Sequence, residues 1–154
     1  AERREIRSPV GLAQPKDRTL AYADVKSAKA EENVLRLLFT DQKLIHGMEE
    51  QLPAAWFSAP VLRKIYERVL ELDRSGSLVD ALAFEGQLET NEMSLLAGIL
   101  EQGVPPGDHR AELREYINTI RLQRVKDGTL TQAGEDPLLT FGRMKNQNAG
   151  GQTI

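Results

Sequence analysis

Cysteine is absent from the 154 residues of this chain, and aromatic residues make up only 5% of it. Without cysteine there are no disulfides, no thiol nucleophile and no cysteine-bound zinc. Runs of the strand-favouring residues Val, Ile, Thr and Tyr are nearly absent too. Leu, Ala, Glu, Arg and Gln dominate instead, and these residues favour helices. The composition therefore predicts an all-α protein that folds without disulfides.

Long apolar segments are also missing. No run reaches the roughly 18 to 20 apolar residues that span a bilayer. The opening AERREIRSPVG carries charges with no apolar segment behind them, which differs from a signal peptide. It lacks an initial Met, as a processed chain or a piece of a longer one would. We expect a protein of the reducing cytoplasm.

Motifs for phosphate binding and nucleophilic catalysis are not found. There is no GxGxxG, no GxxxxGK[ST] and no G-x-S-x-G elbow. The two histidines, His46 and His109, lie far apart. His46 and Glu49 could share a metal ion, although a surface histidine near a helix end is the commoner arrangement. His109 follows Asp108 at an expected helix start, where capping is typical. We expect no catalytic residue, metal or cofactor here.

Charge is unevenly distributed along the chain. Residues 28–105 hold seven Lys or Arg and thirteen Asp or Glu. The pairs Glu31–Glu32 and Glu49–Glu50 are expected to face solvent. Affinity for a phosphate backbone grows with the number of basic contacts. Direct nucleic-acid binding by this acidic region is therefore not expected.

The chain divides into three parts. Pro9 and Pro15 interrupt any long helix in residues 1–26, which are predicted to be a linker or flexible arm. Residues 27–127 predict a bundle of about six helices. Residues 128–154 predict a C-terminal helical hairpin or short extra helix, followed by a tail.

The bundle's helices follow from apolar spacing and turn residues. They are predicted to span about 27–40, 41–51, 58–75, 79–88, 90–102 and 108–127. Ser27 or Asp24 can cap the first helix, and Ser58 is predicted to cap the third. In the fourth, the apolar face would consist of Leu82, Phe84 and Leu88.

The third helix has the clearest repeat. Its apolar residues recur at i, i+1, i+4, i+5, i+8 and i+9 from Val61 to Leu70, and charged residues occupy the other side. Trp56 and Phe57 precede it. An aromatic pair in a loop can be a binding hot spot, but filling the gap between helices is the commoner role.

The C-terminal segment could either pack back on the bundle or present an apolar face to a partner. Its candidate partner-binding residues combine apolar side chains with two basic ones: Leu138, Leu139, Phe141, Arg143, Met144 and Lys145. The apolar residues would be buried in a contact, and the basic ones would lie at its rim.

Three stretches together resemble a known family. They are EENVLRLL at 31–38, DQKLI at 41–45 and WFSAPVLRKIYE at 56–67. In this order and spacing they are similar to the C-terminal helicase-binding domain of bacterial DNA primase. The N-terminal domain of the replicative helicase, which shares that fold, is the alternative. The polar opening and the extra C-terminal segment favour primase.

The resemblance implies a role in DNA replication in the bacterial cytoplasm. A primase domain of this type binds the hexameric replicative helicase and couples primer synthesis to the fork without catalysing a reaction itself. The parent would be a nucleotidyltransferase whose zinc and magnesium sites lie in other domains. One departure is that Gly128 and Gly134 interrupt the long arm that family members usually have between the sixth helix and the hairpin.

Overall fold

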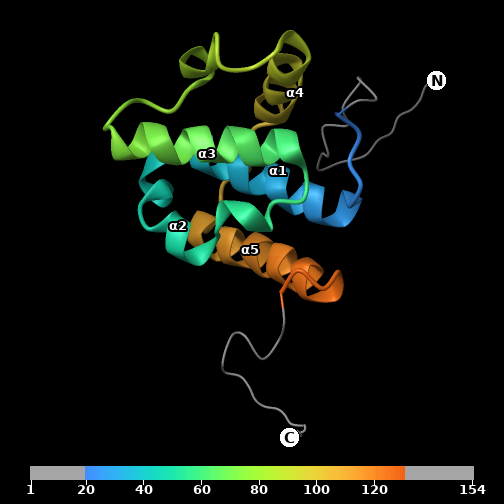
Figure 1. Ribbon diagram of the computed structural model, residues 1–154. Helices are drawn as coiled ribbons and strands as arrows, with labels where there is room; N and C mark the ends of the chain where they lie inside the picture. Colours follow the sequence, from blue (N-terminus) through green and yellow to red (C-terminus); the bar gives the residue numbers. More distant parts are fainter. Residues whose placement is uncertain (1–19, 131–154) are drawn as a thin grey trace, which may run out of the picture. The chain divides into compact units, whose positions relative to one another are not determined.

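A computed structural model describes residues 20–130, and its regular secondary structure is entirely helical over that range (Figure 1). The α-helices are α1 (Val25–Thr40), α2 (Met48–Gln51), α3 (Pro60–Arg74), α4 (Thr90–Glu101) and α5 (His109–Lys126). Three 3-10 helices lie between them: η2 (Gln42–Ile45), η3 (Ala54–Trp56) and η4 (Ala81–Phe84). The predicted all-α class is confirmed. No helix in the described range is long and apolar enough to cross a membrane.

The described residues divide into a compact unit that ends at Thr119 and a second one that begins at Ile120. Helix α5 begins in the first unit and continues into the second. Its own buried stripe consists of Leu113, Ile117 and Ile120. The first unit holds all the other helices.

Helix α1 forms the centre of the first unit. It packs against η2, α3 and α4, and every residue from Ala30 to Leu38 is buried. From the sequence, Glu31 and Glu32 were expected to face solvent. That expectation was wrong, because both glutamates are 0% exposed. A helix surrounded on all sides must satisfy its polar side chains inside the protein.

Predicted helix 41–51 is broken into two short pieces. The backbone of Gly47 adopts the left-handed conformation, with φ 79°. This separates η2 from the single turn of α2. Because a residue with a side chain rarely adopts that conformation, glycine is the residue that permits the break.

The predicted helix at 79–88 is absent, and only the 3-10 turn η4 forms there. The Asp80 side chain caps that turn by accepting from the Ala83 amide. Phe84 is buried and lies 5.6 Å from Phe39, ring centre to ring centre. Leu82, expected on the same buried face, is 71% exposed. A single turn can direct only one large side chain inward, so the helical face that would have buried Leu82 does not exist.

Helix α3 confirms the predicted apolar repeat. Its buried residues are Val61, Leu62, Ile65, Tyr66, Val69, Leu70 and Leu72. The Tyr66 ring stacks on Phe57 at 4.5 Å, and its hydroxyl donates to the Leu52 carbonyl at 2.7 Å. Phe57 therefore fills the core, as the commoner reading of the aromatic pair expected, whereas Trp56 is half-buried.

Of the N-caps predicted for α1 and α3, the structure confirms the first and not the second. Asp24, one of the two candidates, is the N-cap of α1, where its carboxylate accepts from the Ser27 amide. Ser58 does not cap α3. The N-cap position there belongs to Ala59, whose side chain makes no capping hydrogen bond. The missing cap is replaced by a residue from another helix, described next.

Candidate functional site

The partner-binding residues predicted from the sequence fall beyond residue 130. Leu138, Leu139, Phe141, Arg143, Met144 and Lys145 lie outside the described residues, so their role stays a prediction.

The alternative metal site at His46 and Glu49 gains no support. His46 is exposed, and the Glu49 carboxylate instead pairs with Arg74 at 3.1 Å. No group of three or more potential metal ligands occurs among residues 20–130. The His109 ring lies 3.2 Å from the Pro105 carbonyl, and the neighbouring Asp108 caps α5 through the Ala111 amide. This is the capping context that the sequence suggested.

The buried carboxylate of Glu31 holds the start of α3 in place. It accepts hydrogen bonds from the Ser58 amide at 3.0 Å, the Ser58 hydroxyl at 2.7 Å and the Ala59 amide at 3.2 Å. A further bond comes from the Ser27 hydroxyl on its own helix, at 2.5 Å. A negative charge at a helix N-terminus is stabilised by the helix dipole. Glu31 thus supplies the cap that α3 lacks locally.

The buried guanidinium of Arg36 contacts the other end of a neighbouring helix. Its Nε donates to the Ile99 carbonyl, near the C-terminus of α4, at 2.7 Å. It also donates to Asn33 at 2.5 Å and lies 3.8 Å from the buried carboxylate of Glu32. A cation at a helix C-terminus is favourable for the same dipole reason. Helix α1 therefore places an anion at the start of α3 and a cation at the end of α4.

Burial shifts the pKa values of Tyr22 and Arg36, which both contact Glu32. Tyr22 donates its hydroxyl to Glu32, and burial followed by the charge of Glu32 raises the pKa of Tyr22. Burial lowers the pKa of Arg36, although Glu32 partly compensates. These polar groups bond to one another, and all of them are buried except Tyr22, which is half-buried. They stabilise the architecture and are not placed to meet a substrate.

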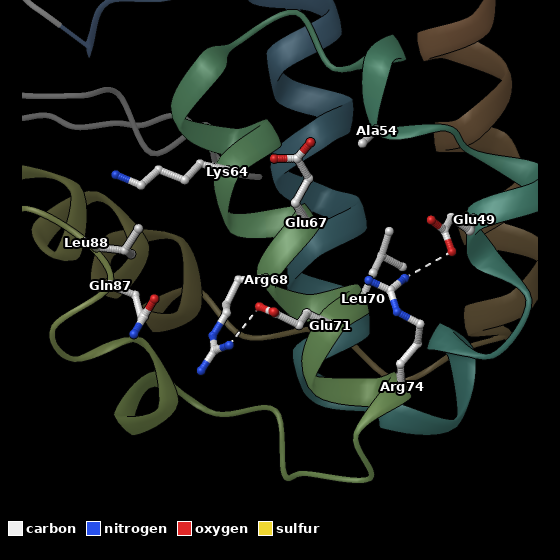
Figure 2. A pocket seen from close by; sticks show the side chains of 10 residues that line it. All are labelled: Glu49, Ala54, Lys64, Glu67, Arg68, Leu70, Glu71, Arg74, Gln87 and Leu88. Atoms are coloured by element: carbon white, nitrogen blue, oxygen red, sulfur yellow. Dashed lines mark hydrogen bonds and ion pairs between the residues drawn. The ribbon is translucent and has the colours of Figure 1, made fainter.

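The outer face of α3 carries a row of charged side chains (Figure 2). A shallow groove of about 470 Å³ runs over it. Its lining includes charged residues of α3 together with side chains from both flanks: Glu49, Ala54, Lys64, Glu67, Arg68, Leu70, Glu71, Arg74, Gln87 and Leu88. Figure 2 shows α3 in the middle, with Glu49 and Gln87 on opposite sides.

The charges along this groove alternate in sign. Arg68 pairs with Glu71 at 2.7 Å on the same helix, and Lys64 pairs with Glu92 at 2.8 Å. Burial would raise the pKa of Glu92, but the hydrogen bonds from Lys64 and from the Glu89 amide bring it below its ordinary value. Glu67 is exposed between the two pairs. We call the outward residues Lys64, Glu67, Arg68 and Glu71 the α3 charge stripe.

The sequence revealed the α3 charge stripe but not the buried polar contacts of Glu31, Glu32 and Arg36. Alternation of charged residues opposite an apolar repeat is visible in the letters of 61–71. Nothing local distinguishes the buried Glu31–Glu32 from the exposed Glu49–Glu50, because burial depends on which helices surround α1. The one available signal was Ser27, four residues before Glu31, where a serine can reach the carboxylate on the same face.

The fold and these surfaces define an all-α domain with an apolar core, buried polar contacts made by α1 and charged residues along the outer face of α3. A family model described as the DnaB-like helicase N terminal domain matches residues 23–121, and the chain belongs to that family. The domain is therefore helicase-related and acts in DNA replication. Searches of the curated proteins and of the solved structures give no match.

Proposed function

We propose that this chain serves as an N-terminal domain of a replicative helicase, where it mediates self-association and docks the primase. The family match over residues 23–121 is the observation that carries the proposal. It favours the helicase's own domain over the primase domain that the sequence motifs suggested first. The role needs no cofactor within the chain and belongs to the bacterial cytoplasm.

The α3 charge stripe supports self-association because it is complementary to itself. A two-fold axis between residues 67 and 68 would place two α3 helices antiparallel. Lys64 of one copy would then face Glu71 of the other, and Glu67 would face Arg68. Two-fold interfaces of this kind use the same patch twice. Each of the four symmetric contacts joins opposite charges.

The expected affinity is modest. Exposed ion pairs contribute about 0.2–1 kcal/mol each, so four pairs supply about 1–4 kcal/mol. Lys64 and Arg68 would also exchange their present partners, Glu92 and Glu71, for residues of the second copy. We therefore expect association at high protein concentration and dissociation as salt screens the charges.

A charge swap tests this pairing. Glu67→Arg would place two cations opposite each other at both symmetric contacts and should leave the chain monomeric. The double variant Glu67→Arg/Arg68→Glu reverses both members of the contact and should restore association. Glu115→Arg, an exposed charge reversal on α5, is the matched control and should behave like the wild type. Sedimentation equilibrium measures all four proteins.

The charge swap distinguishes association through the α3 charge stripe from association through another surface. Association that survives Glu67→Arg would mean that another surface mediates it. Loss of association in both the single and the double variant would mean that the residues matter without pairing as described. Either result rejects the antiparallel arrangement.

The second candidate is the helicase-binding domain of primase, which the order of the motifs at 31–38, 41–45 and 56–67 favours. In that case the chain would be monomeric and would bind a purified hexameric helicase. Truncation after residue 127 would abolish that binding by removing the apolar and basic residues of the C-terminal segment. A monomer that retains binding after truncation would exclude that segment as the contact.

A further inference from the structure

The segment just before α1, drawn in blue in Figure 1, is attached to that helix by a side chain. The Tyr22 hydroxyl donates to Oε2 of Glu32, ten residues further along the chain. None of residues 20–24 is fully buried, whereas Glu32 is 0% exposed. We call residues 20–24 the N-terminal strap. A segment at the surface therefore contacts a carboxylate that lies in the interior.

The Glu32 carboxylate connects the strap to Arg36. Its Oε2 accepts from Tyr22, and its Oε1 lies 3.8 Å from the Arg36 guanidinium. Arg36 is 4% exposed. Because burial disfavours the charged form of each group, both depend on the polar contacts that they make inside the protein. Loss of the Tyr22 hydroxyl would therefore change how the carboxylate and its cation are held.

Arg36 continues this connection to the end of α4. Its Nε donates to the Ile99 carbonyl at 2.7 Å. That carbonyl lies in the last turn of α4, where the helix no longer supplies amides to all of its carbonyls. The Gly103 amide, four residues beyond Ile99, bonds to the Leu100 carbonyl at 3.4 Å. The guanidinium thus supplies a donor at a helix end.

The strap has the features of a segment that opens locally. Ala21 and Ala23 are exposed, and Leu20 and Tyr22 are half-buried, so the strap covers little apolar surface. Its last residue, Asp24, is the N-cap of α1. Segments with few buried apolar contacts open at a lower free energy than the core. Movement of the strap about Asp24 would separate Tyr22 from Glu32 without unfolding α1.

We propose that the N-terminal strap is a releasable latch for the C-terminal end of α4. When the strap is closed, Tyr22 holds the Glu32 carboxylate beside Arg36, and Arg36 holds the Ile99 carbonyl. When the strap opens, water reaches the carboxylate and the contact between Arg36 and Ile99 weakens. The last turn of α4 then frays, together with the connection at residues 102–108 that leads to α5.

The start of α3 is held by a separate set of contacts and stays in place when the strap opens. There the Glu31 carboxylate accepts from the Ser58 and Ala59 amides. These two amides serve as an internal reference for the end of α4. The latch does not involve the α3 charge stripe, and the proposal holds for either of the two candidate functions.

Tyr22→Phe tests the latch because it keeps the ring and removes the hydroxyl. Hydrogen exchange followed by NMR on the full chain resolves individual amides. The amides at residues 99–103 should exchange at least about threefold faster than in the wild type, which is within the range of coupling through contiguous contacts. The Ser58 and Ala59 amides should keep their wild-type rates.

Tyr66→Phe is the matched control. It removes a hydroxyl that donates to the Leu52 carbonyl, away from the strap. Exchange at residues 99–103 should not be selectively accelerated by this change. Selective acceleration there would overturn the proposal, because the end of α4 would then respond to the loss of any buried tyrosine hydroxyl.

Arg36→Lys tests the route from the strap to α4. It keeps a cation near Glu32 and removes the Nε that donates to Ile99. Adding Tyr22→Phe to this variant should cause no further acceleration at residues 99–103, and further acceleration would overturn the proposal. So would wild-type rates at 99–103 in Tyr22→Phe alone, or an equal acceleration of the reference amides in that variant.

Discussion

Removing the Glu31 carboxylate should destabilise the domain strongly. In Glu31→Ala, four hydrogen bonds are lost: one from Ser27, two from Ser58 and one from Ala59. The two hydroxyls can turn toward other acceptors, but the two amides cannot. An unsatisfied buried donor costs about 1–3 kcal/mol. Together with the cavity left by the side chain, we expect a loss of about 3–5 kcal/mol in the free energy of unfolding.

Urea unfolding measures this loss with two signals. Circular dichroism reports the helices, and the fluorescence of Trp56, the one tryptophan of the chain, reports the segment just before α3. Glu31→Gln keeps the shape of the side chain and one acceptor oxygen, so its loss should be smaller. Glu50→Ala removes an exposed glutamate and should change stability by less than about 0.5 kcal/mol.

The reasoning about Glu31 depends on its burial. A loss below about 1 kcal/mol for Glu31→Ala would refute it, because solvent would then be satisfying the Ser58 and Ala59 amides. A loss equal to that of Glu50→Ala would have the same meaning.

Two other perturbations address the same helix and its neighbour. Arg36→Met should lower the free energy of unfolding by about 3–5 kcal/mol, because it removes the cation beside the buried Glu32 carboxylate and the donor to the Ile99 carbonyl; a melting temperature equal to that of the wild type would contradict this. Burial raises the pKa of Tyr66 above its usual value of 10.0. Folding therefore gains stability from Tyr66 below pH 10 and loses it as the pH rises toward the higher folded value. Absorbance at 295 nm should show tyrosine ionisation together with unfolding, and ionisation near pH 10 in a folded chain would contradict it.

The helical class and the α3 repeat could be predicted because they are local. A run of helix formers with apolar residues at 3.6-residue spacing specifies a helix and its buried face, as in Val61 to Leu70. The ends of α3 and α4 are local features as well, because a glycine with positive φ follows each of them: Gly76, with φ 74°, and Gly103, with φ 69°.

The sequence-based predictions were wrong where residues distant in sequence determine whether a side chain is buried or a helix forms. Glu31 meets Ser58 across 27 residues, and Arg36 meets Ile99 across 63. Neither contact leaves a periodic signal. In the region 79–88 the contact that fixes the chain is also with a residue distant in sequence, since the buried Phe84 packs on Phe39. The charge stripe could be recognised in the sequence of α3. The groove could not, because residues from other segments, such as Glu49 and Gln87, also line it.

We propose that this domain of the DnaB-like family works by contact with other proteins, beginning with a second copy of itself. Sedimentation equilibrium of the wild-type chain, at low and high salt and over a wide range of concentration, tests it most directly. We expect a mass that rises from 17.2 kDa toward twice that value at low salt and returns to the monomer at high salt. A mass of 17.2 kDa at every concentration and salt level would contradict it.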